Sequence, residues 1–366
     1  MKALGIILAG GNGRRMKELA NKRAVAAMPM AGSYRAIDFV LSNMSNSSIN
    51  RVAVITQYSA RSLNLHLSSS KWWDFGRKQG GLFVFNPTVT HENNNWYRGT
   101  ADALVQNLDF IRSSHEPYVV IAGGDGIYKI DFNKVLDYHI EKEADITVVC
   151  KRLSVGADVS RFGVIDLDDD KRIVGFEEKP VDSSNNLVSC GIYVIRRRLL
   201  ISLLEQCEEM EWFDFVSDVL MRQRRVMKLY AYEHEGFWSN IATVQSYFDT
   251  NMDFLKPEVR EEFFYTYPEI HSKVDDYPPA KYNDGACVSN SLIASGTIVN
   301  GKVENSVIFQ KTFIGTNCSI RDSIVLNGAH IGDGVVLDHC IVESRMTLEP
   351  GTSYKGEAGK IKIVTD

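Results

Sequence analysis

The amino-acid sequence predicts an α/β domain followed by a left-handed parallel β-helix. Over the first 250 residues, short apolar runs alternate with amphipathic stretches, which is typical of a sheet with crossover helices. After about Pro278 the pattern changes to short apolar units separated by Gly, Asn and Asp, without helical periodicity. We therefore expect the α/β domain over residues 1–250, a linker over 251–280 and the β-helix domain over 281–366.

In the first part, four apolar runs are predicted as β-strands: residues 4–9, 52–57, 118–123 and 146–151. Two segments carry apolar side chains at helical spacing. Residues 100–113 place three of them behind Thr100, which we expect to cap the helix, and residues 197–206 carry four leucines in the same way. Both are expected to be packing helices without chemistry of their own.

The C-terminal part is a repeat. Three units begin alike, with Asn-Ser-Leu-Ile at 290–293, Asn-Ser-Val-Ile at 305–308 and Asp-Ser-Ile-Val at 322–325, and Asp-His-Cys-Ile at 338–341 is a looser fourth. Successive units start 15, 17 and 16 residues apart, as a triangular coil with about three five-to-six-residue faces per turn would require. We expect about four rungs, whose exposed strands are a candidate oligomer surface.

Composition excludes several classes of protein. A net charge of -5 and a pI near 6.0 argue against general affinity for nucleic acid. No apolar run approaches the ~20 residues of a membrane span, and a strand rather than a signal peptide follows the N-terminus. We expect a cytoplasmic protein. Its six cysteines form no C-x-x-C pair, which favours reduced, mostly buried thiols over zinc ligands.

The first chemical motif is a glycine loop directly after the first strand. It contains Gly10, Gly11 and Gly13, followed by Arg14 and Arg15. Adjacent glycines let backbone N–H groups approach a phosphate, and arginines neutralise its charge. The loop is neither a Walker loop nor the dinucleotide G-x-G-x-x-G. Taken alone, it is equally consistent with phosphate binding and with a structural turn.

Six further motifs follow the loop in order. They are Asn-Lys-Arg-Ala at 21–24, Tyr-Arg-Ala-Ile-Asp-Phe at 34–39 with Leu-Ser-Asn at 41–43, Ile-Thr-Gln-Tyr at 55–58, Asn-Trp-Tyr-Arg-Gly-Thr-Ala-Asp-Ala at 95–103, Gly-Asp at 124–125 and Phe-Glu-Glu-Lys-Pro at 176–180. In this order they resemble the bacterial glucose-1-phosphate adenylyltransferases, the ADP-glucose pyrophosphorylases of glycogen synthesis. The resemblance implies a Rossmann-like mixed-sheet nucleotidyltransferase domain followed by the β-helix. It also implies the reaction of ATP with glucose 1-phosphate to give ADP-glucose and pyrophosphate.

The resemblance carries site residues with it. The phosphates of ATP would be held by Gly10, Gly11 and Gly13 with Arg15 as a catalytic residue, and Tyr97 and Gly99 would line the nucleotide side. Glucose 1-phosphate would be held by Gly163, Glu178, Lys179 and Ser189. A lysine suits a sugar phosphate as a flexible point charge, and a glutamate can accept from sugar hydroxyls. Magnesium prefers one or two carboxylates plus substrate phosphates, and the resemblance places Asp125, with Asn240 as a weaker ligand, at its site.

Three departures from the family pattern fall on the metal and phosphate positions. Where the family usually reads Arg-Ala-Lys-Pro-Ala, this chain has Val25 in place of the lysine. Where the family reads Trp-Arg-Asp, this chain has Ser239 and Asn240, so a basic residue and the second metal carboxylate are both missing. The usual Asp-His pair has become Asp125 and Gly126. Losing two or three such contacts should reduce catalysis by roughly three or more orders of magnitude.

Our first hypothesis is therefore that the chain resembles the D-type subunit, a regulatory or activity-enhancing partner of a catalytic subunit in a hetero-tetramer. The second is a working adenylyltransferase, in a homo-tetramer, for which Asn240 suffices. A third treats the β-helix as an acyltransferase that uses His330 or His339, although a lone histidine on such a rung is more often structural. Gln57 and Trp96 are candidates for relaying effector binding to the nucleotide cleft.

Overall fold

The computed structural model describes residues 2–76, 80–88, 96–181, 183, 185–273 and 275–365. The chain divides into two compact units. Unit 1 comprises Met1–Gly11, Val40–Tyr58 and Leu67–Trp238, and unit 2 comprises Asn12–Phe39, Ser59–His66 and Ser239–Asp366. Unit 2 therefore combines the segment after the first two loop glycines with the β-helix.

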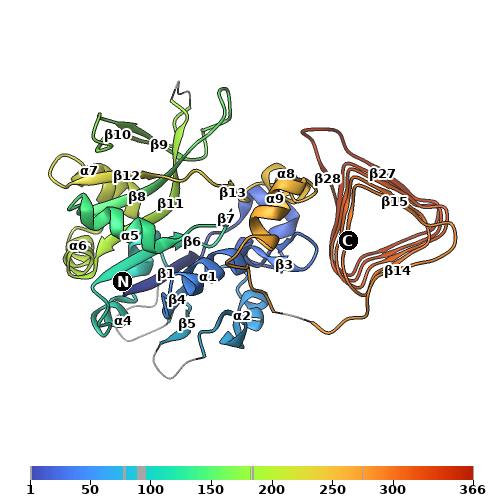
Figure 1. The fold of residues 1–366 in the computed structure, drawn as a ribbon, viewed down its shortest axis with the longest axis horizontal. Coiled ribbons are helices and arrows are strands. Elements are labelled where there is room, and N and C mark those ends of the chain that lie inside the picture. The colour runs from blue at the N-terminus through green and yellow to red at the C-terminus, as the bar shows by residue number, and fades with distance from the viewer. Residues whose placement is uncertain are drawn as a thin grey trace. The chain divides into compact units, whose positions relative to one another are not determined.

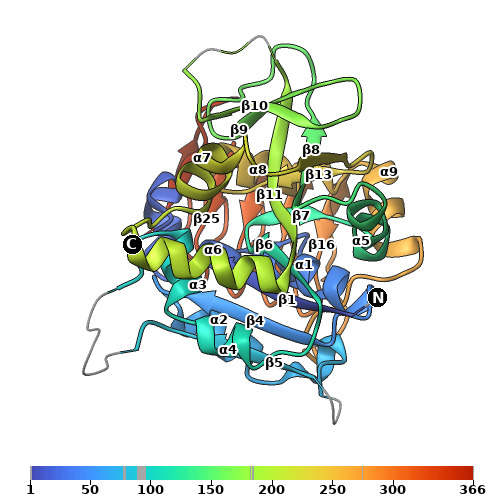
Figure 2. The ribbon, with the colours of Figure 1, turned by 90° about the vertical axis from the view of Figure 1, so that its left-hand side faces the viewer.

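Unit 1 is built on a mixed sheet that has nine strands in the described part of the chain (Figure 1). The strands are β1 (Ala3–Ala9), β4 (Arg51–Thr56), β5 (Gly81–Phe85), β6 (Tyr118–Gly123), β8 (Ile146–Arg152), β9 (Gly163–Leu167), β10 (Ile173–Glu178), β11 (Leu187–Arg196) and β12 (Leu229–Glu233). Their order is β10-β9-β11-β6-β1-β4-β5, and β8 pairs with both β11 and β12. Figure 2 shows β9 and β10 at one end of the sheet and β4 and β5 at the other. The four predicted strands are β1, β4, β6 and β8, which confirms the α/β prediction.

The remaining elements of the first 265 residues are mostly short. The helices are α1 (Ala36–Asn46), α2 (Arg61–Leu67), α3 (Thr100–Val105), α4 (Leu108–Arg112), α5 (Phe132–Glu141), α6 (Arg197–Glu209), α7 (Met221–Gln223), α8 (Val244–Asp253) and α9 (Pro257–Arg260). Short 3-10 or π helices are η1 (Arg14–Ala20), η2 (Val25–Ala27), η3 (Ser70–Trp73), η4 (Phe215–Leu220) and η5 (Glu261–Tyr265), and the short strands are β2 (Pro29–Met30), β3 (Tyr34–Arg35), β7 (Gly126–Tyr128) and β13 (Trp238–Asn240). Helix α8 crosses residue 250, and the expected linker 251–280 contains α9 and η5.

The prediction of one helix over residues 100–113 was wrong, because the segment forms α3 and α4 with a break between them. The side-chain amide of Asn107 donates to the carbonyl oxygen of Ala103 at 2.8 Å, where a continuing helix would receive the backbone N–H of residue 107. The expected cap was also wrong. Gly99 occupies the N-cap position, and the Thr100 hydroxyl instead accepts from the Phe215 N–H at 2.8 Å. The predicted helix 197–206 is α6, which extends to Glu209.

The C-terminal part forms three parallel sheets, which is the arrangement of the expected left-handed β-helix. They are β14 (Lys281–Tyr282), β17 (Ile298–Val299), β20 (Phe313–Ile314), β23 (His330–Ile331) and β26 (Thr347–Leu348); β15 (Cys287–Ser289), β18 (Lys302–Glu304), β21 (Ser319–Arg321), β24 (Val336–Asp338) and β27 (Ser353–Lys355); and β16 (Leu292–Ile293), β19 (Val307–Ile308), β22 (Ile324–Val325), β25 (Cys340–Val342) and β28 (Lys362–Val364). Each sheet has five strands in the described part, so the prediction of about four rungs was one too few. The last rung lacks both the Asn-Ser or Asp-Ser start of the first three and the looser Asp-His start of the fourth.

The repeated polar starts make the corners of the β-helix. Asn290, Asn305, Asp322 and His339 all adopt positive φ, between 40° and 51°, a conformation that short polar side chains tolerate better than most. The following serines form a ladder: the Ser306 N–H donates to the Ser291 hydroxyl and the Ser323 N–H to the Ser306 hydroxyl, each at 3.1 Å. Backbone groups at this corner are therefore satisfied from rung to rung, which explains why the motif recurs.

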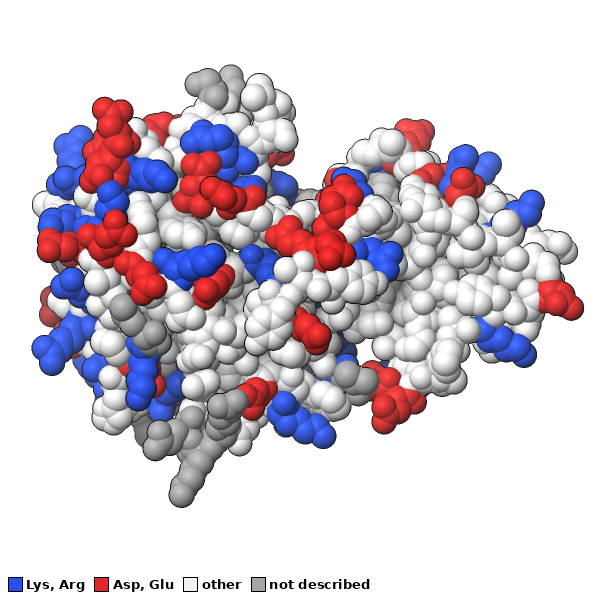
Figure 3. Space-filling view, in the orientation of Figure 1, with Lys and Arg blue, Asp and Glu red and all other residues white. Residues whose placement is uncertain are grey.

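Two further observations concern the surface and the thiols. Among the described residues, no helix has both the length and the apolar character that crossing a membrane demands. Acidic and basic side chains are intermixed on the face drawn in Figure 3. Five of the cysteines are buried, and Cys287 is exposed.

Helix α5 contributes a buried histidine that makes stability depend on pH. Burial, with a smaller contribution from the charge of Arg196, lowers the pKa of His139 from 6.5 to about 4. Since the unfolded state binds more protons at this histidine between these values, the contribution of His139 to stability is complete above about pH 6.5 and is lost as the pH falls toward 4. Replacing His139 by asparagine should reduce the loss between about pH 7 and about pH 5 by about 1–2 kcal/mol, measured by urea unfolding at both pH values. An unchanged pH dependence would show that His139 is not responsible.

Candidate functional site

The sheet of unit 1 has a topological switch point at its centre. Strand β1 pairs in parallel with β4 on one side and with β6 on the other. The chain first runs outward through β4 and β5 and only later returns to add β6. In open α/β sheets, ligands bind in the crevice outside the carboxyl ends of the strands at this point.

Two of the predicted motifs lie at that crevice. Gly10 and Gly11 follow β1, and Asp125 follows β6. Leu8 is in register with Gly123, and the Gly124 N–H donates to the Leu8 carbonyl oxygen at 2.9 Å. The start of the glycine loop and the Asp125 carboxylate are therefore on neighbouring strand ends, as a site for a nucleotide and its metal requires.

The rest of the glycine loop lies in unit 2. Gly13 has a φ of 62°, and a Cβ there would lie 2.7 Å from the Ala20 Cβ and 3.2 Å from a Val25 methyl group. Gly13 is thus required by the turn itself. By contrast, nothing lies within 4 Å of a Cβ on Gly11, so that position is open to a ligand. Arg15 is exposed at the start of η1, which is anchored by its buried apolar residues.

Tyr97 is fixed in unit 1 by two hydrogen bonds to one side chain. The Tyr97 N–H donates to Gln57 Oε1 at 2.7 Å, and Gln57 Nε2 donates to the Tyr97 carbonyl oxygen at 3.3 Å. The phenol accepts from Asn107 at 3.1 Å, and burial raises the pKa of Tyr97. Beside it the rings of Trp96 and Tyr58 stack at 5.9 Å, 61% and 43% exposed. Asn95, the first residue of this motif, lies outside the described residues.

Gly99 has a structural reason to be glycine. A Cβ there would lie 2.3 Å from the carbonyl oxygen of Phe213. That oxygen accepts from the N–H groups of Ala101 and Asp102 at 2.8 and 3.1 Å. The close approach holds the start of α3 against the segment before η4, so Gly99 shapes the site through the backbone. No sequence motif indicates this contact.

The four predicted sugar phosphate residues come from adjoining strands of unit 1. Gly163 begins β9 and is in register with Glu178 at the end of β10. The Lys179 N–H donates to the Phe162 carbonyl oxygen at 3.0 Å, and its ammonium pairs with Glu178. Ser189 is buried on β11, one residue beyond Val188, which pairs with Val164 next to Gly163. A carboxylate, an ammonium and a hydroxyl therefore converge at one end of the sheet.

Because Gly163 has no side chain, there is room beside it for the carboxylate of Glu178. A Cβ on Gly163 would lie 2.5 Å from the Phe176 ring and 3.1 Å from Glu178 Oε2. Replacing Gly163 by alanine should therefore displace Glu178 and raise the Kd for glucose 1-phosphate by about tenfold or more, measured by calorimetry. Gly76→Ala is the matched control, because nothing lies within 4 Å of a Cβ there. Equal affinity of the two variants would contradict this reading.

Asp125 and Asn240 differ as metal ligands. The Asp125 carboxylate is half-buried at the switch point, which fits magnesium, a cation that binds hard oxygen ligands. The Asn240 side-chain oxygen accepts from the Ala242 N–H at 3.1 Å in a local turn. It carries no negative charge, and one of its acceptor directions is already used. Asp125 therefore fits a magnesium ligand, whereas Asn240 fits less well.

Comparison with known proteins identifies the family. The profile of the Nucleotidyl transferase family matches residues 4–257, and that of the GlmU-like C-terminal hexapeptide family matches residues 278–357. The chain is 38% identical to the glucose-1-phosphate adenylyltransferases of Bacillus cereus and Bacillus anthracis, over 99% of this chain and 97% of theirs. For the same enzyme of Bacillus cytotoxicus the identity is 37%, over 99% and 96%. The chain belongs to the glucose-1-phosphate adenylyltransferase family.

Two of the departures from the adenylyltransferase pattern have visible structural consequences. Val25 packs against Gly13, so the side chain that replaces the usual lysine borders the glycine loop with an apolar surface. At position 126, a Cβ would lie 2.8 Å from the ring of Tyr128. The buried Tyr128 hydroxyl has no hydrogen-bond partner among the described residues. The Tyr128 ring therefore lies where a side chain at position 126 would begin.

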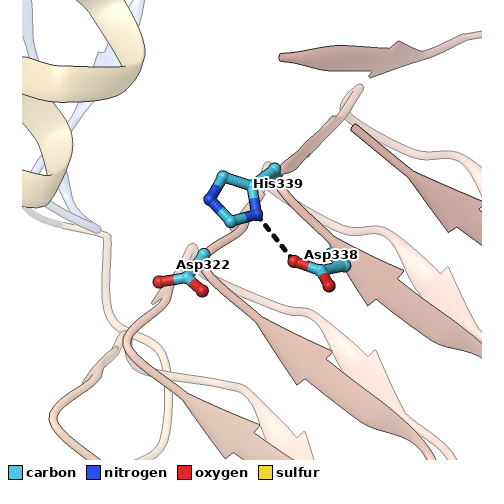
Figure 4. Close-up of side chains that lie close together, drawn as sticks. All are labelled: Asp322, Asp338 and His339. Carbon is cyan, nitrogen blue, oxygen red and sulfur yellow. Dashed lines mark hydrogen bonds and ion pairs between the residues drawn. The ribbon is translucent and has the colours of Figure 1, made fainter. Parts of the chain in front are cut away.

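The two histidines of the β-helix have different surroundings. His330 stacks flat on Phe313, with ring centroids 4.5 Å apart. His339 Nδ1 lies 2.6 Å from Asp338 Oδ1, close to Asp322 (Figure 4). Arg321 also pairs with Asp338 at 2.5 Å and, with His339, lowers the pKa of Asp338. His339 thus has the orienting carboxylate that the sequence did not reveal, but that carboxylate already neutralises an arginine.

Proposed function

We propose that this chain is a regulatory or activity-enhancing subunit of ADP-glucose pyrophosphorylase in glycogen synthesis, acting in the cytoplasm beside a catalytic subunit in a hetero-tetramer. The observation that carries the proposal is the contrast between its subsites. Gly163, Glu178, Lys179 and Ser189, the residues proposed to hold glucose 1-phosphate, lie on adjoining strands, and Lys179 pairs with Glu178. At the metal and phosphate positions, Asn240 is engaged in a turn and Val25 is apolar.

We expect such a chain to retain substrate binding although most of its catalytic activity is lost. In this family the phosphate of glucose 1-phosphate attacks ATP, so rate comes from positioning and from neutralising charge. Magnesium, held by Asp125, would supply charge neutralisation at the phosphates. Without a lysine at 25 and a carboxylate at 240, we expect turnover roughly three orders of magnitude below that of a catalytic subunit.

The experiment measures magnesium-dependent pyrophosphate release from ATP and glucose 1-phosphate. It compares this chain alone, a catalytic adenylyltransferase subunit from the same organism alone, and the two mixed. We expect little release by this chain alone, together with a higher rate or an altered effector response in the mixture. Robust turnover by the chain alone would overturn the proposal.

The second candidate is a competent homo-tetrameric adenylyltransferase. It is favoured by Asp125 at the switch point and by the names of the relatives reported above, glucose-1-phosphate adenylyltransferases of three Bacillus species. The same assay distinguishes the two, because only this candidate expects full turnover without a partner. The acyltransferase candidate has the Asp338 and His339 pair in its favour, and failure to bind acyl-CoA in calorimetry would dispose of it.

A further inference from the structure

The side-chain amide of Asn107 makes two hydrogen bonds within unit 1. Its Nδ2 donates to the Ala103 carbonyl oxygen at 2.8 Å and to the Tyr97 phenol oxygen at 3.1 Å. A side-chain amide has two N–H donors, so both donors are used. The half-buried side chain of Asn107 is therefore held from two directions, by helix α3 and by Tyr97.

A role in the helix alone does not account for asparagine at this position. In a continuous helix, the Ala103 carbonyl oxygen would accept from the backbone N–H of residue 107. In the structure that N–H donates to the Leu104 carbonyl oxygen at 3.1 Å, and the side-chain amide takes its place at Ala103. The amide thus replaces a bond that the backbone could make. What asparagine adds is the second bond, to the phenol of Tyr97.

Tyr97 is held at its two ends by different residues. Gln57 bonds to its backbone N–H and carbonyl oxygen, whereas Asn107 bonds to its phenol. The ring is half-buried and packs against the apolar core of unit 1. A side chain that is fixed only at its backbone can still change rotamer. The bond from Asn107 therefore restricts the direction in which the ring of Tyr97 points.

We propose that Asn107 is a positioning residue for nucleotide binding, which acts through the phenol of Tyr97. By holding the ring in one orientation before ATP arrives, it reduces the binding free energy spent on ordering the site. The proposal rests on the nucleotide-binding role proposed for Tyr97, and not on whether the chain turns over alone. Asn107 lies beyond the sequence motif that contains Tyr97, which ends at Ala103.

The test is the Kd for ATP with magnesium, measured by calorimetry on the full chain and on two variants. Asn107→Ala removes both side-chain bonds. Asn107→Ser retains one O–H donor, which can bond to the carbonyl oxygen four residues back, so that only the phenol loses its partner. We expect both variants to raise the Kd for ATP by about two- to tenfold, the effect of losing one hydrogen bond.

A double-mutant cycle shows whether the effect passes through the phenol. Tyr97→Phe keeps the ring and removes the phenol oxygen, so adding Asn107→Ser to it should raise the Kd for ATP no further. The Kd for glucose 1-phosphate should be unchanged in all these variants, since a general disturbance of the sheet would weaken both ligands. Asn133→Ala is the matched control. Asn133 is also half-buried, its amide donates to Asp131, and its loss should leave both Kd values unchanged.

Three results would overturn the proposal. One is a raised Kd for ATP in Asn107→Ala but not in Asn107→Ser, which would assign the effect to the bond with Ala103. The second is a further rise when Asn107→Ser is added to Tyr97→Phe, and the third is an equal loss of affinity for glucose 1-phosphate. An unchanged Kd for ATP in both variants would likewise contradict it. Because these are binding measurements, their outcome is separate from that of the pyrophosphate assay, which tests the regulatory role.

Discussion

Replacing Val25 by lysine and Asn240 by aspartate in one chain is expected to raise its rate of ADP-glucose formation by roughly two to three orders of magnitude. The Val25 side chain borders Gly13, so a lysine there would bring an ammonium to the glycine loop. Aspartate at 240 would keep an oxygen for the Ala242 N–H and add the missing negative charge. The measurement is pyrophosphate release with magnesium by this variant and by the unmodified chain, each without a partner.

The control is Val25→Leu/Asn240→Ser, which changes the same positions without adding charge and should leave the rate unchanged. Adding Asp125→Asn to the doubly substituted chain should remove the gain, because the carboxylate proposed to hold magnesium is lost. If the doubly substituted chain binds glucose 1-phosphate but turns over no faster than the unmodified one, residues 25 and 240 do not limit turnover. Ser239 would then be the next position to change, although its hydroxyl is engaged with Thr250 at 2.6 Å.

The parts of the site that could be predicted from the sequence follow strands directly. The family resemblance named Gly10, Asp125 and Glu178, and all three lie at strand ends: Gly10 follows β1, Asp125 follows β6 and Glu178 ends β10. The contacts of Gly99 with Phe213 and of Val25 with Gly13 could not be predicted. Both contacts depend on how segments that are separate in the sequence pack together, and local sequence patterns do not indicate the distances between such segments.

In the fold, too, some features could be predicted from the sequence and others could not. Apolar runs predicted β1, β4, β6 and β8, because burial and strand length are local properties. The break between α3 and α4 depends on one side-chain amide, that of Asn107, which competes with the backbone. The fifth rung of the β-helix was missed because it has no repeated polar start. Unit 2 depends on an ion pair between residues 320 positions apart, which no periodicity reveals.

That ion pair joins the segment after the glycine loop to the β-helix. Arg23 Nη2 lies 2.6 Å from Glu343 Oε1, and the two side chains are 10% and 1% exposed. Replacing Glu343 by alanine is expected to lower the free energy of unfolding by about 3–5 kcal/mol, because it leaves the Arg23 charge buried without a counter-ion. Urea unfolding measures the loss, and hydrogen exchange of the β25 amides, which directly precede Glu343, assigns it to unit 2.

Removing both charges should lower the free energy of unfolding far less than removing one. Arg23→Met/Glu343→Leu keeps most of the buried volume and leaves no unpaired charge, so it should recover most of the stability lost in Glu343→Ala. Among the described residues, Arg23 Nη1 and Glu343 Oε2 have no hydrogen-bond partner, which already limits how much the pair stabilises relative to an apolar replacement. A loss below about 1 kcal/mol in Glu343→Ala would show that water reaches Arg23, since only a desolvated charge carries the larger penalty.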